Sequence, residues 1–185
     1  MVCGVFRKIP GQRVHRLFYP QSPAVVASAH RNEVGALLAT SIMPVSLEPP
    51  MVGVALGRQQ RTKRLVDLSG CFSACWVSYQ SLEAVRKLAE PTEVGVADKL
   101  SRLGLRYRWG EVVKAPVLED AVAWVECVVD WSRDVGDHVF YAAEVRAAYA
   151  VEDFEEYWGF RVYKPILYVG AARKGMPSFV RFDVE

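Results

Sequence analysis

Hydroxyl and basic side chains cluster between residues 39 and 63, on both sides of the apolar run Pro50–Leu56. If a helix begins soon after this run, its first turn offers unpaired N–H groups and partial positive charge. An arginine and nearby hydroxyls would then complete a site for a phosphate monoester. Composition alone favours a plainer explanation, with ordinary strand and cap hydroxyls and a solvated basic helix face. The residues of this cluster are Ala39, Thr40, Ser41, Ser46, Gly57, Arg61, Thr62 and Lys63.

Short β-forming runs, many of them bounded by prolines, dominate the pattern around this cluster. From Ala121 onward the apolar period falls to two, which predicts a hairpin that turns near Ser132–Gly136. In its second arm the odd positions from Val139 to Ala147 are apolar and are expected to share one face. The predicted strands are Ser22–Ala29, Gly35–Met43, Met51–Leu56, Cys71–Val77, Ala123–Asp130, Val139–Tyr149 and Pro165–Val169.

Helical spacing is confined to short stretches between these strands. The predicted helices are Thr62–Ser69, a stretch that starts from an N-cap at Ser81, and Val96–Leu103. Because most strand connections are too short for parallel crossovers, the pattern favours an antiparallel barrel over a Rossmann fold. The sequence has neither a G-x-G-x-x-G fingerprint nor a P-loop, so a nucleotide would have to be held by another device.

Composition and charge narrow the classes of protein further. The chain has 185 residues, 51% of them hydrophobic and 24% charged, which predicts one globular domain over residues 1–185. A net charge of +2 gives no reason to expect nucleic acid or a membrane surface as a partner. Arg7 and Lys8 stand where a signal peptide would be apolar, so we expect a cytoplasmic protein. The cysteines and histidines show no metal-ligand spacing, and no metal site is predicted.

An ordered series of motifs resembles the flavin reductase-like, FMN-binding split β-barrel family. The series covers about Tyr19 to Gly170, nearly the whole chain. It consists of the hydroxyl strand at Thr40-Ser41, P-V-S-x-E-P-P at residues 44–50, R-T at 61–62, Asp98-Lys99, Ala115-Pro116, Glu126-Cys127, Gly136-Asp137-His138, Glu144-Val145 and Lys164-Pro165. Two positions depart from the family pattern, because Leu38 replaces a usual hydroxyl and Cys75 replaces a frequent asparagine.

The resemblance implies a mainly β fold, an antiparallel split β-barrel of Greek-key type with a few short peripheral helices and a core over about residues 19–170. It implies an NAD(P)H-dependent flavin reductase that transfers hydride from NADH or NADPH to flavin. FMN is the expected cofactor, with FAD as the other candidate, and Thr40, Ser41, Arg61 and Thr62 are expected to hold its phosphate and ribityl chain. His138 is expected beside the flavin and the nicotinamide, as a positioning or substrate-contact group; a strand-start histidine satisfied by its aspartate neighbour is an equally good explanation.

Partners and alternative functions also follow from the resemblance. A homodimer is expected, with Phe154–Phe160 supplying apolar area, although packing of these rings over the barrel end is the plainer explanation. Reduced flavin could pass to a monooxygenase or another acceptor. Two other functions fit the same residues: a non-enzymatic FMN electron carrier of flavoredoxin type, and an enzyme related to pyridoxamine-phosphate oxidase.

Overall fold

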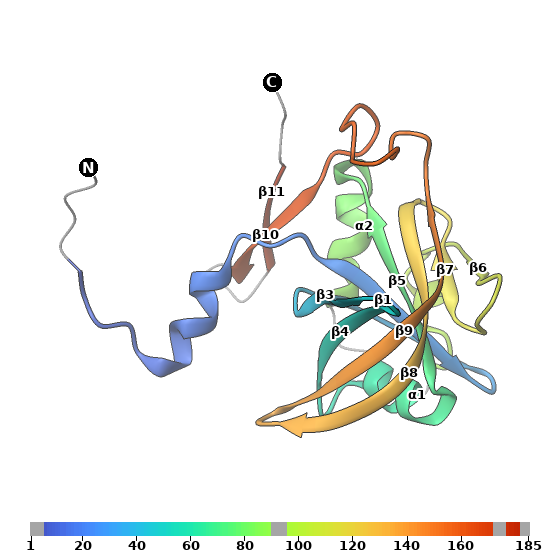
Figure 1. The fold of residues 1–185 in the computed structure, drawn as a ribbon, viewed down its shortest axis with the longest axis horizontal. Helices are drawn as coiled ribbons and strands as arrows, with labels where there is room; N and C mark the ends of the chain where they lie inside the picture. Colours follow the sequence, from blue (N-terminus) through green and yellow to red (C-terminus); the bar gives the residue numbers. More distant parts are fainter. Residues whose placement is uncertain (1–5, 90–95, 172–176, 182–185) are drawn as a thin grey trace.

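Seven antiparallel strands form the main sheet, in the order β2-β1-β5-β8-β9-β4-β3 (Figure 1). The computed structural model describes residues 6–89, 96–171 and 177–181, so Cys3 lies outside the described residues. The protein is mainly β, as predicted. The strands are β1 (Ala24–His30), β2 (Glu33–Ala39), β3 (Ile42–Leu47), β4 (Pro50–Gly57), β5 (Cys71–Val77), β8 (Ala121–Val135) and β9 (His138–Ala150).

The sheet curls around an inner core. Leu37 of β2 and Val54 of β4 belong to the same buried cluster, although these strands lie near opposite ends of the sheet order. Phe72 from β5 and Tyr141 from β9 complete the centre of this cluster. The strands therefore wrap a shared interior, in agreement with the expected architecture.

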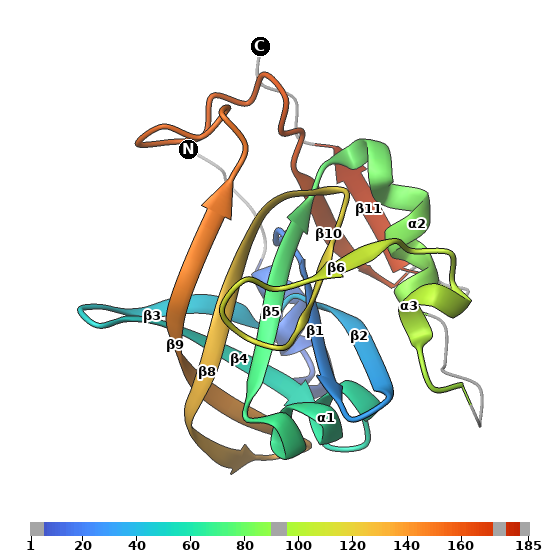
Figure 2. The ribbon, with the colours of Figure 1, turned by 90° about the vertical axis from the view of Figure 1, so that its right-hand side faces the viewer.

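A second core covers the outer face of β1, β2 and β5. Helices and two small hairpins supply its other side, and Figure 2 shows them beside β5, β1 and β2. Leu82, Val85 and Leu100 from the helices pack against Val25 and Cys75 of the sheet. The covering elements are α2 (Leu82–Arg86), η3 (Lys87–Ala89), α3 (Lys99–Arg102), β6 (Tyr107–Trp109), β7 (Pro116–Leu118), β10 (Ile166–Ala171) and β11 (Pro177–Arg181).

Two of the helix predictions are confirmed and one needs correction. Helix α1 (Arg61–Ser69) ends at Gly70, whose φ of +69° suits glycine. A 3-10 turn, η2 (Tyr79–Ser81), leads into α2 close to the predicted start. The third helix is shorter than predicted: Asp98 caps it by accepting from the Ser101 N–H, so it begins at Lys99. The sequence pattern did not indicate the N-terminal 3-10 helix η1 (Gly11–Phe18).

The strand predictions hold in outline, with two corrections. The run Gly35–Met43 is two strands, β2 and β3, because the chain leaves the sheet at Thr40-Ser41. The long hairpin turns at Gly136-Asp137, later than predicted, and its strands are longer. Bulges between Glu126 and Cys127 and between Val129 and Trp131 shift the pairing. The odd-position face predicted for β9 holds from Val139 to Val145, which packs against the inner core; Arg146 is the extra residue of the first bulge, so Ala147 pairs with Glu126 and falls on the other face. None of the described helices is long and apolar enough to cross a membrane.

A buried carboxylate on β8 ties the loop after β6 to the sheet. Glu126 is fully buried and accepts four hydrogen bonds, from the backbone N–H groups of Glu111, Val112 and Val113 and from Trp124 Nε1. Burial raises the pKa of Glu126, but the three backbone donors and Trp124 more than offset it, so the pKa lies below its ordinary value. A Cβ at Gly110 would lie 2.7 Å from Glu126 Oε2, which explains the glycine there.

Replacing Glu126 with glutamine should destabilise the fold by about 1–3 kcal/mol at pH 7, because an amide NH₂ would face backbone N–H donors. The folded pKa is depressed, so this stabilisation is present above the unfolded pKa of about 4.3 and is lost as the pH falls through the folded pKa. Urea unfolding of both proteins should therefore show a gap at pH 7 that narrows below about pH 4. Glu119→Gln, at a half-exposed ion pair with Arg106, is the control and should change stability by less than about 0.5 kcal/mol.

Candidate functional site

Strand pairing brings three parts of the predicted site together, where β4 ends and β9 begins. The Ser41 carbonyl accepts a hydrogen bond of 2.9 Å from the Ala55 N–H, which places Thr40-Ser41 beside the end of β4. Gly57, the last residue of β4, pairs with His138, the first residue of β9. The Arg58 N–H then donates to the Asp137 carbonyl at 3.1 Å. The hydroxyl strand, the turn before α1 and the Gly-Asp-His motif therefore lie together.

The turn between β4 and α1 is fixed by a side chain that the motif reasoning did not single out. Gln60 Oε1 accepts from the Gly57 N–H at 2.9 Å, and the Gln60 N–H donates to the Gly57 carbonyl at 3.0 Å. Helix α1 then begins at Arg61, with no acidic residue in its first turn and no side-chain cap from Gln60. A helix start of this kind presents N–H groups and partial positive charge to an anion.

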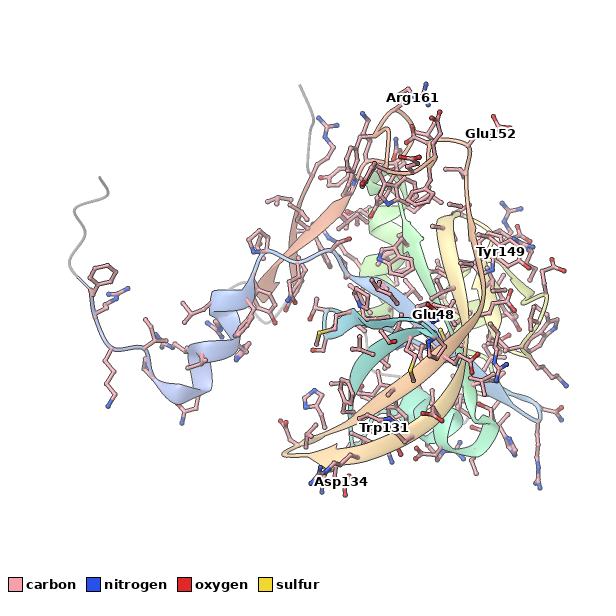
Figure 3. All side chains as sticks on the ribbon, in the orientation of Figure 1. Glu48, Trp131, Asp134, Tyr149, Glu152 and Arg161 are labelled. Carbon is pink, nitrogen blue, oxygen red and sulfur yellow. The ribbon has the colours of Figure 1, made fainter. Side chains whose placement is uncertain are left out.

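The basic side chains of this region each contact a carboxylate. Arg58 lies 3.5 Å from Asp134 and Lys63 lies 2.6 Å from Asp67. Arg61 Nη2 donates to Glu33 Oε2 at 3.1 Å, and Arg64 contacts the same oxygen. Figure 3 places Asp134 at the turn end of the β8–β9 hairpin.

Arg61 has further contacts that turn its guanidinium toward β2. It donates to the carbonyls of Val96 and Ala97, the latter at 2.5 Å, in addition to Glu33. These contacts use three of the five donors of a guanidinium. Glu33 was not singled out in the sequence, because nothing in the local pattern indicates a partner 28 residues away.

The remaining predicted residues differ in their surroundings. Thr62 is 3% exposed and packs against Gly35, where an added Cβ would lie 3.2 Å from its Oγ1. Ala39 is buried in the inner core. Ser46 follows a bulge in β3 and pairs with Met51, so it lies five residues along the strand from Ser41, or roughly 16 Å at about 3.3 Å per residue. The pairing thus brings Thr40, Ser41, Gly57 and His138 together and leaves Ser46 apart from them.

His138 is held by its neighbour. Its Nδ1 lies 2.7 Å from Asp137 Oδ1, and its side chain is 43% exposed. The hydrogen bond and charge of His138 lower the pKa of Asp137 below its ordinary value. Nδ1 is therefore committed to Asp137, and the ring edge that carries Nε2 is available to a ligand. Across the described residues, no cluster of three or more His, Cys, Asp and Glu side chains suits a metal ion.

Comparisons with known proteins place this geometry in a family. The flavin reductase like domain matches residues 15–173. An uncharacterised protein of Aeropyrum pernix is 32% identical over 94% of this chain and 66% of its own, so the chain spans about two thirds of that relative. A flavin reductase of Pseudomonas putida is 30% identical over 76% of each chain.

A solved structure agrees with the sequence relatives. The NADH:FAD oxidoreductase of Streptomyces globisporus superposes with a TM-score of 0.78 at 25% identity, covering 98% of this chain and 99% of that one. The family match spans most of the chain, and the fold of the described residues agrees with it. The chain belongs to the flavin reductase like domain family.

Proposed function

We propose that the protein is an FMN-binding, NAD(P)H-dependent flavin reductase. One observation carries the proposal. The Gly57–Arg61 turn, Thr40-Ser41 and His138 lie together where β4 ends and β9 begins. The flavin reductase and the NADH:FAD oxidoreductase among the similar proteins support this class of reaction. The second of them supports NADH as a donor and FAD as the other candidate flavin.

The start of α1 fits a phosphate group. Arg61, Lys63 and Arg64 place positive charge in its first turns, where the helix dipole is also positive. Cations are unfavourable at a helix N-terminus, and here Glu33 and Asp67 pair with these three side chains; a phosphate would share in this neutralisation or replace part of it. We propose that Arg61 with the N–H groups of this turn holds the FMN phosphate, and that Thr40 and Ser41 contact the ribityl chain. The proposed site also includes Thr62, Lys63, Gly57, Ala39 and Ser46. Ser46 lies farther away, so it would contact a part of the flavin distant from the phosphate.

Bound FMN would supply a ring that accepts hydride directly at N5. The protein's own task is then to orient the partners, and His138 suits that task because Asp137 fixes its Nδ1. We propose that His138 contacts the nicotinamide donor and positions it.

The proposal extends to assembly and location. We take the protein to be a cytoplasmic homodimer that delivers reduced flavin to a monooxygenase or another acceptor. Apolar side chains on the surface support a protein contact: Leu17 and Phe18 of η1 are 65% and 67% exposed, and Leu47 at the tip of the β3–β4 hairpin is 91% exposed. The segment carrying η1 extends away from the sheet (Figure 1).

Removing Arg61 should weaken FMN binding by one to two orders of magnitude, because a charge-assisted hydrogen bond is worth about 1.5–3 kcal/mol. Riboflavin has no phosphate and should bind Arg61→Ala and the wild type alike. Fluorescence-quenching titrations with both flavins measure the contrast. Equal losses for FMN and riboflavin would show damage to the fold. An unchanged FMN affinity would mean that the phosphate binds elsewhere. Arg58→Ala, titrated in the same way, would then test whether Arg58 holds it.

Removing the carboxylate of Glu33 should have the opposite effect. Glu33→Gln leaves Arg61 and Arg64 without their shared anion, so we expect FMN to bind several-fold more tightly while riboflavin is unaffected. The gain should shrink in 0.5 M salt, because the interaction is partly exposed. Glu83→Gln, which breaks an ion pair with Arg86 on α2, is the matched control. Weaker FMN binding in Glu33→Gln would contradict this expectation and indicate that Glu33 holds Arg61 in its binding position.

His138→Ala should impair NAD(P)H oxidation about tenfold in kcat/KM, the loss expected for one such contact, with FMN affinity within twofold of wild type. Steady-state oxidation of NADH and NADPH with added FMN, followed by absorbance, provides the measurement. His15→Ala, on the exposed helix η1, is the control. Unchanged kinetics in His138→Ala would leave the histidine a structural residue. A yellow wild-type protein that consumes neither nucleotide would argue for the electron-carrier function.

A further inference from the structure

An apolar pocket lies at the opposite end of β9 from His138. Its volume is about 540 Å³, within the range of small-molecule sites. The ends of β5, β8 and β9 form one side, and the segment 151–165 forms the other. Ala148, on its floor, lies ten residues beyond His138 along β9. Figure 3 shows Tyr149, another lining residue, well away from Asp134 at the hairpin turn. The pocket is therefore separate from the turn proposed for the phosphate.

Aromatic rings supply most of the pocket walls. Seven aromatic residues line it: Trp76, Trp124, Tyr149, Phe154, Trp158, Phe160 and Tyr163. Trp124 pairs with Tyr149 and with Cys75, so these two rings lie on the sheet face opposite to Trp76 and Ala148. The ring walls are therefore Trp76 and the four rings of the segment 151–165. None of the described residues that line the pocket is charged, so it favours a neutral occupant. Phe154 is 43% exposed, which leaves ring surface open to a ligand. Flat apolar walls of this kind suit a planar aromatic molecule.

One polar feature breaks the apolar lining. The hydroxyls of Ser22 and Tyr163 lie 3.4 Å apart, from segments 141 residues apart in the chain. Ser22 follows Gln21, whose backbone pairs with Tyr168 of β10 in both directions, at 3.2 and 2.8 Å. Burial raises the pKa of Tyr163, so its hydroxyl stays protonated at neutral pH and can donate. This pair could bind one hydroxyl or carbonyl oxygen of a ligand.

A buried carboxylate holds the loop wall in place. Asp153 accepts from the N–H groups of Arg161, Val162 and Tyr163, at 3.0, 3.0 and 2.9 Å, which closes the segment 151–165 into a compact loop. These donors, Tyr163 first, keep the pKa of Asp153 below its ordinary value.

The strands that form the other wall are braced on their far face. There the Arg108 guanidinium lies 4.4 Å from the centroid of the Trp124 ring, and the Tyr149 ring stacks on Trp124 at 4.5 Å with an interplanar angle of 17°. With the Asp153 hydrogen bonds on the loop side, both walls are in place before a ligand binds.

We propose that this pocket binds a neutral, planar aromatic molecule of one or two rings that carries a hydroxyl or carbonyl oxygen. The rings stack among the aromatic walls and the oxygen meets the Ser22–Tyr163 hydroxyl pair. A second copy of the chain is a poorer occupant, because a stable interface needs at least about 1,200 Å² in total and this recess admits only a small group. The inference does not rest on the flavin site or on hydride transfer.

The probe is 2-naphthol, with its binding measured by equilibrium dialysis on the full chain in the presence of FMN. We expect saturable binding at one site per chain, and at least tenfold weaker binding of 2-naphthoate, which has the same rings but a charge. Trp158→Ala should weaken 2-naphthol binding about tenfold or more, the usual scale for an aromatic wall in a ligand site. Trp109→Ala, at an exposed tryptophan outside the pocket lining, is the matched control and should leave it unchanged.

Two further variants keep the test independent of folding. Ala148→Leu fills the pocket from an exposed position and should abolish binding while leaving the thermal midpoint within a few degrees of wild type. Tyr163→Phe should weaken 2-naphthol binding about 2- to 10-fold, the range for one neutral hydrogen bond. FMN affinity, measured in the same samples, should not change in either variant, so a failed flavin proposal remains distinguishable from a failed pocket.

Three outcomes would overturn the proposal. The first is equal affinity for 2-naphthol and 2-naphthoate. The second is binding that survives both Ala148→Leu and Trp158→Ala, which would place the probe elsewhere. The third is binding that disappears as the protein concentration rises, with a matching shift to dimer in sedimentation, because the pocket would then be covered by a second copy.

Discussion

The pairing of β8 with β9 is the interaction on which the rest of the structure depends. β8 continues the sheet to β5, β1 and β2, and β9 continues it to β4 and β3, so this one ladder joins the two halves that wrap the inner core. Its two bulges bend and twist the ribbon, which lets the sheet curl. The ladder also separates the two sites that we propose: His138 begins β9 beside Gly57, and Ala148 to Ala150, at its other end, line the apolar pocket with the segment 151–165.

Buried carboxylates take the place of apolar packing where loops meet this ribbon. Glu126 and Asp153 each gather three consecutive backbone N–H groups of a loop that forms no regular element. In both places a glycine packs directly against the carboxylate. A Cβ at Gly110 or Gly159 would lie within 3 Å of a carboxylate oxygen, so a larger residue would not fit without a shift. Acceptors of this kind satisfy donors that a loop leaves open, which an apolar side chain could not do.

Features that depend on residues close together in the sequence could be predicted, whereas features that depend on distant residues could not. Strand β5 and helix α1 were predicted almost to the residue, because prolines, glycines and apolar spacing mark them locally. The extra residue of the first bulge, Arg146 on β9, carries no local signal, so the prediction of one shared face was wrong at Ala147. Of the predicted site residues, Thr40, Ser41, Gly57 and His138 do lie near one another, and their binding of a flavin stays a prediction. The partner of Arg61 was missed, because Glu33 comes from another strand and only the folded chain brings the two together.

The balance of charge at α1 determines how a phosphate could bind there. In the absence of an anionic ligand, Glu33 neutralises Arg61 and Arg64, and two carbonyls take further donors of Arg61. A phosphate that enters must either displace this carboxylate or share the guanidinium with it. If the phosphate displaces the carboxylate, its net gain is the difference between two charge-assisted contacts; if it shares the guanidinium, as the loss expected for Arg61→Ala requires, it keeps its own contact. At the proposed flavin site, affinity would then depend on Glu33 as well as on Arg61, although no family motif names this carboxylate.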